Sequence, residues 1–299
     1  MTAAVTVGLP VFNGERYLGD TLESLLAQSF TDFEILVSDN GSTDGTEEIA
    51  STYARADQRV RYTRHRTNRG AAWNYSHLVG ETASPYFKWS GHDDLYDPGY
   101  LSACMTELGV GGPEVALCYP RTRLIDAEGR VKRAYDDGLD LRSGSPSQRL
   151  RALLENIGLA NAVFGVIRTA ALRRTRLIAP YNDSDIVLLI ELALIGRFHE
   201  IPQTLFHRRM HPGQAYQVNR TATDVSAWFD PVSARRFVLP RGRRFVEAAR
   251  AVARADLGVA ERARCEAILA RTWGPRDLYH TLREVPAAVR GLRPARAPA

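Results

Sequence analysis

An alternation of strand-like and helix-like segments over the first hundred or so residues is the feature that most constrains the fold. Val5–Phe12 is mostly apolar and rich in β-branched residues, as is typical of a strand buried on both faces. Glu15–Ser29 then spaces four leucines along one face of a helix. The same two patterns recur at Phe33–Ser38, Asp44–Ala54, Arg59–Arg64, Ala71–Thr82, Tyr86–Ser90 and Pro98–Leu108. This alternation predicts an α/β fold with a mostly parallel, Rossmann-like sheet flanked by helices.

Beyond residue 108 the pattern is less regular. Asp183–Gly196 is almost entirely apolar but too short to cross a bilayer, so it is expected to be a buried helix. From Arg243 onward the spacing is helical, with breaks expected at Pro275 and Pro286 and a disordered end at 293–299. Strands are expected at Val115–Tyr119, Ala162–Arg168, Phe198–Ile201 and Leu205–Met210, and a helix at Ser147–Ile157.

The net charge of +5 is unevenly distributed along the chain. Residues 1–240 carry 26 basic and 28 acidic side chains, whereas 241–299 carry 13 and 6. The main body therefore gives no reason to expect binding to nucleic acid. The basic helical tail could lie on an anionic membrane surface, or it could pack on the rest of the protein and expose its arginines.

The compartment is predicted from three further features. The N-terminus lacks the basic leader of a signal peptide, and no apolar run approaches the roughly 18 residues of a membrane span. The three cysteines, Cys104, Cys118 and Cys265, form no paired motif and are expected to be buried thiols. We therefore expect a cytoplasmic protein, with peripheral contact to the inner face of the plasma membrane through 241–299 as the open alternative.

The loop Asp39–Gly45 directly follows a predicted strand and leads into a helix. Asp39 would lie at the carboxyl end of that strand, where ligands bind in such sheets, and the helix N-terminus supplies free amide donors. The other interpretation is an ordinary turn with an aspartate cap. An EF-hand is excluded because its third position is Gly41 and its twelfth is Ala50. Neither lysine follows a glycine, so there is no Walker A loop, and no GxGxxG follows the first strand.

A second polar turn, His92-Asp93-Asp94, follows the strand Tyr86–Ser90 and should lie near Asp39. Adjacent carboxylates repel each other unless they share a cation or one is protonated. Oxygen ligands of this kind suit Mg²⁺ or Mn²⁺ that also binds a substrate phosphate. The alternative is a solvated acidic turn.

Five segments together resemble the inverting glycosyltransferases of family 2, which have a GT-A fold. They are VGLPVFNGERYL, VSDNGSTDGT, RTNRGAAWN, SGHDDLYDPGYL and SDIVLLIELALIGRFHEIPQTLFHRRMHPGQ. The resemblance covers roughly residues 3–215, and the motifs occur in the family's order. It implies a GT-A domain with a helical C-terminal extension.

The resemblance also implies roles for individual residues. Asp39 would read the base of a nucleotide-sugar donor, Asp94 and His211 would hold a metal, and Asp185 would be the general base. The remaining donor-binding positions implied are Pro10, Val11, Phe12, Glu15, Asn68, Arg69, Gly70, Asp93 and Arg209. Many members have Glu-Asp where this chain has Ser184-Asp185, so Asp183 stays open as the alternative base or as a helix cap.

The function implied is metal-dependent transfer of a sugar, with inversion, from a nucleoside diphosphate sugar to a hydroxyl of a glycan or glycolipid. A UDP- or dTDP-linked donor is favoured, with Mn²⁺ or Mg²⁺ as cofactor, in a bacterial cell-envelope pathway. Residues 1–108 would bind the nucleotide sugar, 109–215 the acceptor, and 216–299 would form the extension. The alternatives are a catalytically silent sugar- or partner-binding module and a nucleotidyltransferase, although the first loop lacks the lysine that the latter needs.

Overall fold

The computed structural model describes residues 2–214, 218, 221–231 and 239–291, and every structural statement below concerns these residues. A nine-stranded sheet forms the centre, in the spatial order β3-β2-β1-β4-β8-β6-β9-β5, with β7 paired to β6. The strands are β1 (Val5–Val11), β2 (Phe33–Asp39), β3 (Val60–Arg64), β4 (Tyr86–Trp89), β5 (Leu95–Tyr96), β6 (Val115–Ile125), β7 (Val131–Tyr135), β8 (Val166–Arg168) and β9 (Arg197–Arg209).

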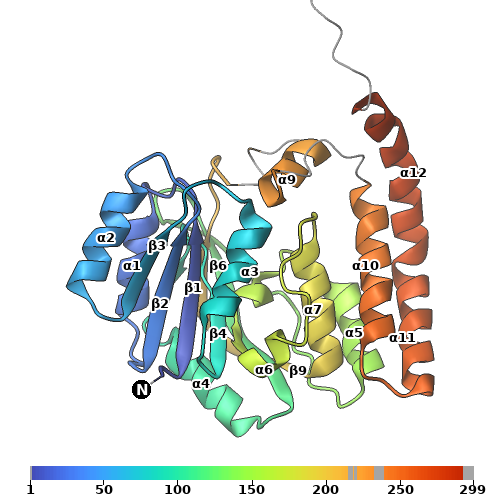
Figure 1. The fold of residues 1–299 in the computed structure, drawn as a ribbon. Coiled ribbons are helices and arrows are strands. Elements are labelled where there is room, and N and C mark those ends of the chain that lie inside the picture. Colours follow the sequence, from blue (N-terminus) through green and yellow to red (C-terminus); the bar gives the residue numbers. More distant parts are fainter. Residues whose placement is uncertain (1, 215–217, 219–220, 232–238, 292–299) are drawn as a thin grey trace, which may run out of the picture.

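Helices flank this sheet and form the C-terminal part of the chain (Figure 1). They are α1 (Leu18–Leu26), α2 (Thr46–Ala56), α3 (Ala71–Glu81), α4 (Tyr100–Val110), α5 (Pro146–Asn156), the 3₁₀ helix η1 (Asn161–Phe164), α6 (Thr169–Leu172), α7 (Ser184–Ile195), α9 (Ala222–Phe229), α10 (Pro240–Arg254), α11 (Val259–Thr272) and α12 (Gly274–Gly291). In Figure 1, α1 and α2 lie on the opposite side of β1 and β2 from α3.

The first half of the sheet confirms the predicted α/β pattern. Strands β3, β2, β1 and β4 are parallel neighbours, and Val11 at the end of β1 pairs with Asp39 at the end of β2. The carboxyl ends of these strands therefore meet at one edge, where ligands bind in such folds. The second half is mixed, because β8 runs antiparallel to both β4 and β6. The predicted division at residue 108 falls within α4, and strands from both sides of it belong to the one sheet.

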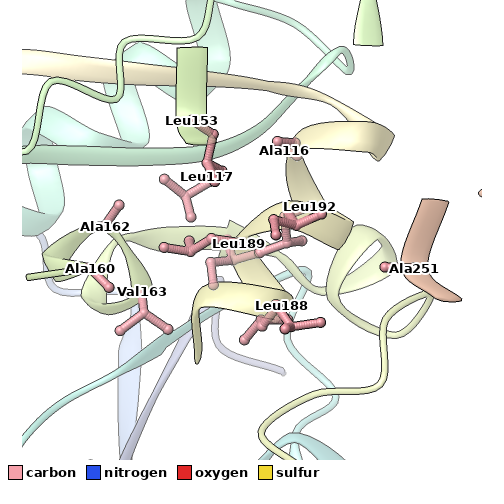
Figure 2. Packing of buried hydrophobic residues seen from close by; sticks show 14 of the residues in the cluster. Ala116, Leu117, Leu153, Ala160, Ala162, Val163, Leu188, Leu189, Leu192 and Ala251 are labelled. Atoms are coloured by element: carbon pink, nitrogen blue, oxygen red, sulfur yellow. The ribbon is translucent and has the colours of Figure 1, made fainter. Parts of the chain in front are cut away.

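Helix α7 lies at the centre of the larger core, as its apolar sequence predicts. Leu188, Leu189 and Leu192 are fully buried, and Figure 2 shows them among side chains from β6, α5, η1 and α10. Because apolar residues surround the whole helix, both the sheet side and the C-terminal side must cover it. The strand-and-helix body and the extension thus share one core.

The C-terminal helices pack on the body of the protein. Helix α10 packs against α7, and α11 packs against α5. Of the apolar positions in 241–299 that could face a membrane, Val252 and Leu269 are buried, and Phe245 and Ile268 pack against the core. Leu278 on α12 is exposed.

The structure differs from the sequence-based elements in several places. Residues 161–164 form a 3₁₀ helix rather than the start of a strand, because a short apolar run fits a buried helical turn equally well. The two strands predicted around Pro202 are one strand, β9, whose pairing with β6 shifts register near Pro120. Helix α12 continues across Pro286. The patterns did not indicate β5, β7, α6 or α9, and residues 293–299 lie outside the described part.

No helix in the described part of the chain is long and apolar enough to span a membrane. The three cysteines are free and buried, as predicted.

Candidate functional site

The loops that follow β1 and β2 are joined by hydrogen bonds at the carboxyl edge of the sheet. The amide of Asn13 donates to Ser42 Oγ (2.9 Å), and the amide of Thr43 donates to Asn13 Oδ1 (2.9 Å). Glu15 accepts the amide of Gly45 (2.7 Å), immediately before α2. Glu15 therefore helps to fix the turn that leads into α2. These hydrogen bonds join the two loops into one side of the predicted donor site.

Asp39 is completely buried at the end of β2. One carboxylate oxygen accepts the amide of Ser42 (2.8 Å) and the other accepts the hydroxyl of Tyr62 (2.8 Å). Burial, together with this hydrogen bond and the negative charge of Asp39, raises the pKa of Tyr62 well above its usual range. Asp39 thus holds the turn together, and its predicted role toward a base would be added to this one.

The segment after β3 is hydrogen-bonded to the loop that follows β2. Asn40 donates to Asn68 Oδ1 (2.9 Å) and accepts the amide of Arg69 (3.0 Å). Gly70 has a φ of +87°, and a Cβ there would clash with the carbonyl oxygen of Phe229 at the end of α9. Only glycine fits this close approach. Helix α9 is thereby brought against the predicted nucleotide-binding loop.

The predicted donor-pocket residues of β1 differ in exposure. Pro10 and Val11 are buried, and the carbonyl of Val11 accepts the amide of Asn40 (2.9 Å). Phe12 is 40% exposed. Phe12 is thus the apolar side chain of these three that a ligand could contact. Arg69 lies over the ring of Trp73, with its guanidinium carbon 3.8 Å from the ring centroid.

The acidic turn after β4 is brought together with His211, from the chain beyond β9. His211 Nε2 lies 3.0 Å from Asp93 Oδ2. Asp94 is buried, and its Oδ1 accepts the amide of Arg209 (3.0 Å). A Cβ on Gly91 would lie 2.7 Å from Asp94 Oδ2 and 3.0 Å from Asp93 Oδ1, so both carboxylates flank this glycine. His211 thus reaches this turn through Asp93, and its predicted sharing of a metal with Asp94 stays a prediction.

The pKa values of the two carboxylates of this turn are shifted in opposite directions. Burial and then the charge of Asp93 raise the pKa of Asp94 to about 7. Burial alone would raise the pKa of Asp93 as well, but the hydrogen bond from His211 and the nearby histidine charges lower it. The turn therefore concentrates negative charge that a cation would stabilise.

A divalent cation fits this donor set only if substrate completes its coordination. Among the described residues, no cluster of three or more histidine, cysteine, aspartate or glutamate side chains is arranged to hold a metal by itself. Asp94 binds the amide of Arg209 through Oδ1, so its Oδ2 can serve as a ligand. Mg²⁺ and Mn²⁺ commonly bind one or two carboxylates and take further ligands from phosphates. Asp93, Asp94 and His211 suit such a site.

Arg209 is held on the protein side of this turn. Its side chain donates to the carbonyls of Asp93 (2.8 Å) and Ala127 (2.9 Å), and its guanidinium lies over the ring of Tyr17. It is 2% exposed. These contacts give Arg209 a supporting role for the acidic turn, and its predicted contact with the donor stays a prediction.

Asp185 lies in the first turn of α7, and its Oδ1 accepts the amide of Ile186 (2.9 Å). Burial and then the charge of Asp183 raise the pKa of Asp185 to about 6. Asp183 occupies the N-cap position but makes no capping hydrogen bond. Its carboxylate pairs instead with Arg244 (3.3 Å) and Arg241 (3.6 Å) of α10. The side chain of Asp183, one candidate for the cap of α7, therefore forms ion pairs with the C-terminal extension instead.

Arg208, to which the sequence analysis assigned no role, lies near several of the predicted site residues. Its guanidinium donates to the carbonyl of Leu159 (2.8 Å) and to Asn161 Oδ1 (2.5 Å). Its positive charge acts on Asp94, Asp137 and Asp185, which come from three other segments. The available signal was the strand itself, because neighbouring residues on a strand point to opposite faces. Arg208 and Arg209 could not share one environment.

A model of the family "Glycosyl transferase family 2" matches residues 6–178. The chain belongs to glycosyltransferase family 2. An uncharacterized glycosyltransferase of Rickettsia typhi is 33% identical over 122 residues, covering 41% of this chain and 37% of that protein. Chondroitin synthase of Escherichia coli is 24% identical over 212 residues, covering 69% of this chain and 29% of the synthase. The chain thus spans well under half the length of these curated relatives.

Solved structures of nucleotide-sugar transferases share the family's GT-A fold with this chain. TarS 1–349 of S. aureus in complex with UDP superposes with a TM-score of 0.65 at 17% identity, covering 98% of this chain and 79% of that fragment. A mannosyltransferase of Pyrobaculum calidifontis, in complex with GDP-Man and Mn²⁺, gives a TM-score of 0.55 at 16% identity, covering 97% and 76%. These likenesses include the C-terminal region, so the fold prediction is confirmed.

Proposed function

We propose that this family 2 protein is an inverting hexosyltransferase that moves a sugar from a nucleoside diphosphate sugar to a hydroxyl of a glycan or glycolipid. The observation that carries the proposal is the convergence of Asp93 with His211, 118 residues apart in sequence, at the sheet edge that also holds Asp39. Known structures with this fold bind UDP, UDP-GlcNAc or GDP-Man, which supports a nucleotide-sugar donor. We favour UDP or dTDP.

Asp185 is the proposed general base. A base works best when its pKa approaches the working pH, and burial moves the pKa of Asp185 to about 6. At neutral pH it is ionised and can accept the proton of the acceptor hydroxyl. Attack on the face opposite the leaving group then inverts the anomeric carbon. Arg208 acts on both Asp185 and Asp94, and so places positive charge between the base and the acidic turn.

We assign the donor's diphosphate to the acidic turn. Asp94 and His211 would hold Mn²⁺ or Mg²⁺, with Asp93 contacting the sugar or ribose. When bound, the cation would offset the charge that develops on the departing diphosphate. Asp39, Phe12 and the segment Asn68–Gly70 would surround the nucleoside.

We also propose a cytoplasmic location with peripheral membrane contact, suited to a lipid-linked acceptor in cell-envelope synthesis. The supporting feature is an exposed apolar stripe on α12, formed by Leu278, Tyr279, Leu282 and Val285. Arg283 lies beside it and could contact anionic headgroups.

A thermal-shift screen of UDP-, dTDP- and GDP-sugars with Mn²⁺ tests the donor proposal. A bound donor raises the melting temperature by mass action. Slow release of the nucleoside diphosphate without acceptor would distinguish an enzyme from a silent binding module. An NMR spectrum of the product's anomeric proton then distinguishes inversion from retention. Absence of any shift across the panel would contradict nucleotide-sugar binding.

A further inference from the structure

The segment that precedes α7 is fixed by the C-terminal extension. Asp183 has a left-handed backbone, with a φ of +64°, which is uncommon for a residue other than glycine. Its carboxylate is 3.3 Å from Arg244 and 3.6 Å from Arg241, both on α10. The residue two positions later is Asp185, the proposed base. The extension thus contacts the chain directly beside the reacting group.

Arg244 is itself held rigidly. It is 4% exposed, and it pairs with Asp277 of α12, which is 1% exposed, at 2.5 Å. Its guanidinium carbon lies 4.3 Å from the ring centroid of Trp273, and the indole N–H of Trp273 donates to the carbonyl of Leu154 in α5 (3.2 Å). A buried arginine between two carboxylates costs desolvation, and breaking such a group leaves an unpaired charge. The position of Arg244 is therefore set by Asp277 of α12 and by Trp273, which follows α11 and is itself hydrogen-bonded to α5.

A purely structural role would be to attach the extension to the body. Apolar packing of α10 on α7 and of α11 on α5 already does this. The ion pair adds something that apolar packing does not, namely a positive charge beside Asp183, whose negative charge raises the pKa of Asp185. It also fixes the backbone from which the first turn of α7 starts.

We infer that Arg244 is a positioning residue for the base: through Asp183 it fixes the first turn of α7 and offsets the negative charge beside Asp185, making the extension part of the active site. This inference rests on the proposed role of Asp185. It assigns 216–299 a function in the reaction, beyond any contact with a membrane.

The charged and titratable groups that face this end of α7 come from several elements: Asp183 of the preceding loop, Arg208 of β9, Tyr75 of α3, Arg241 and Arg244 of α10, and Asp277 of α12. At the other end of α7, Glu191 pairs with Arg254 (2.8 Å), and Arg149 donates to the carbonyl of Ala193 (2.7 Å). Those groups are engaged with each other or with backbone. Removal of Arg244 would therefore leave the charge of Asp183 less compensated and raise the pKa of Asp185.

The test uses the whole chain labelled with ¹³C at the aspartate carboxyls, with the Asp185 signal identified by its loss in Asp185→Asn. In Arg244→Met we expect the titration midpoint of Asp185 to move up by about 0.5–1 pH unit, because the positive charge that compensates Asp183 is lost. Asp183→Asn should move it down. Adding Arg244→Met to Asp183→Asn should then produce a smaller rise than it does alone.

The matched control is Arg250→Met, which removes a positive charge from the same helix but contacts Glu247 rather than Asp183. It should leave the midpoint unchanged. Arg244→Lys should restore part of the wild-type value. If Arg244→Met does not fold, Arg241→Met gives a smaller shift in the same direction, because Arg241 is more distant and more exposed.

The same variants are then assayed for release of UDP from UDP-GlcNAc and of GDP from GDP-mannose across pH. On the acidic limb of the pH profile, at pH values below the pKa of Asp185, Arg244→Met should lower kcat about threefold to tenfold. The KM for the donor should be unchanged. Equal midpoints in wild type, Arg244→Met and Asp183→Asn would overturn the inference. Shifted midpoints together with full turnover in Asp185→Asn would instead retain the contact and overturn the proposed base.

Discussion

Replacing Asp185 by asparagine should make the protein more stable and much less active. The amide keeps the shape of the side chain and can still accept the amide of Ile186, but it cannot take a proton. Removing a positioned general base lowers turnover by about 10²–10⁴-fold. Donor affinity should change little, because the donor-binding residues lie in other segments.

The gain in stability follows from the pKa of Asp185. The folded protein raises it from 3.8 to about 6, so ionising this carboxyl is harder in the folded than in the unfolded chain. Stability is therefore lost as the pH rises from about 4 through 6, and the loss is complete above the folded pKa. Each pKa unit corresponds to about 1.4 kcal/mol, so the loss amounts to about 2–3 kcal/mol when solvent access to the side chain is allowed for.

Asp185→Asn should recover this loss at pH 7.5, raising the melting temperature by roughly 3–5 °C. At pH 4 the wild type is protonated, and the two proteins should melt together. Differential scanning calorimetry at both pH values, paired with a donor-turnover assay, measures both effects. Asp183→Asn is the matched control, because it should reduce turnover far less. A pH-independent difference in melting temperature would refute the assigned pKa, and a larger loss of turnover in Asp183→Asn would reassign the base.

Three further outcomes are expected. Asp39→Ala should weaken binding of a nucleoside diphosphate, measured by calorimetry, by about 1.5–3 kcal/mol, the value of a lost charged hydrogen bond. The control Tyr62→Phe removes only the hydrogen bond within the protein and should bind nearly as well as the wild type. Equal affinity in the wild type and both variants would exclude Asp39 from the site. Excess EDTA should abolish transfer and added Mn²⁺ or Mg²⁺ should restore it, whereas full activity in EDTA or in Asp94→Asn would show that arginines alone stabilise the leaving group. Anionic vesicles should retain the intact protein at low salt and release it at high salt, and Leu278→Ser with Leu282→Ser should abolish retention; recovery of the intact protein with the soluble fraction at low salt would end the membrane proposal.

The spacing of apolar residues predicted the strands and helices of the first part of the chain, because these elements depend on nearby residues. Most strands and helices up to residue 110 followed from residue spacing, and the edge that holds Asp39 and the acidic turn followed from the parallel arrangement. The resemblance to a family assigned His211 to a metal together with Asp94. Its contact with Asp93 was not predicted, because no spacing rule joins residues 118 positions apart.

The features that sequence reasoning missed all depend on distant contacts. Asp183 looked like a helix cap, and only the folded chain brings Arg244 to it from 61 residues away. Arg208 had no role assigned from the sequence, but β9 turns it toward Asn161. Gly70 was expected beside the nucleotide, but the sequence did not show that the carbonyl of Phe229 at the end of α9 would lie against it. Sequence patterns reveal the elements of such a site, but not the partners that orient it.

The burial of α7 on all sides has a practical consequence for protein engineering. Ala248, Ala251 and Val252 of α10 belong to the same core as Leu188 and Leu189. A truncated chain ending near residue 215 would expose this apolar surface to water and should aggregate. Chimeras made to exchange acceptor specificity within the family should therefore place their junctions outside the region from α7 to α11. That whole region should come from a single parent protein.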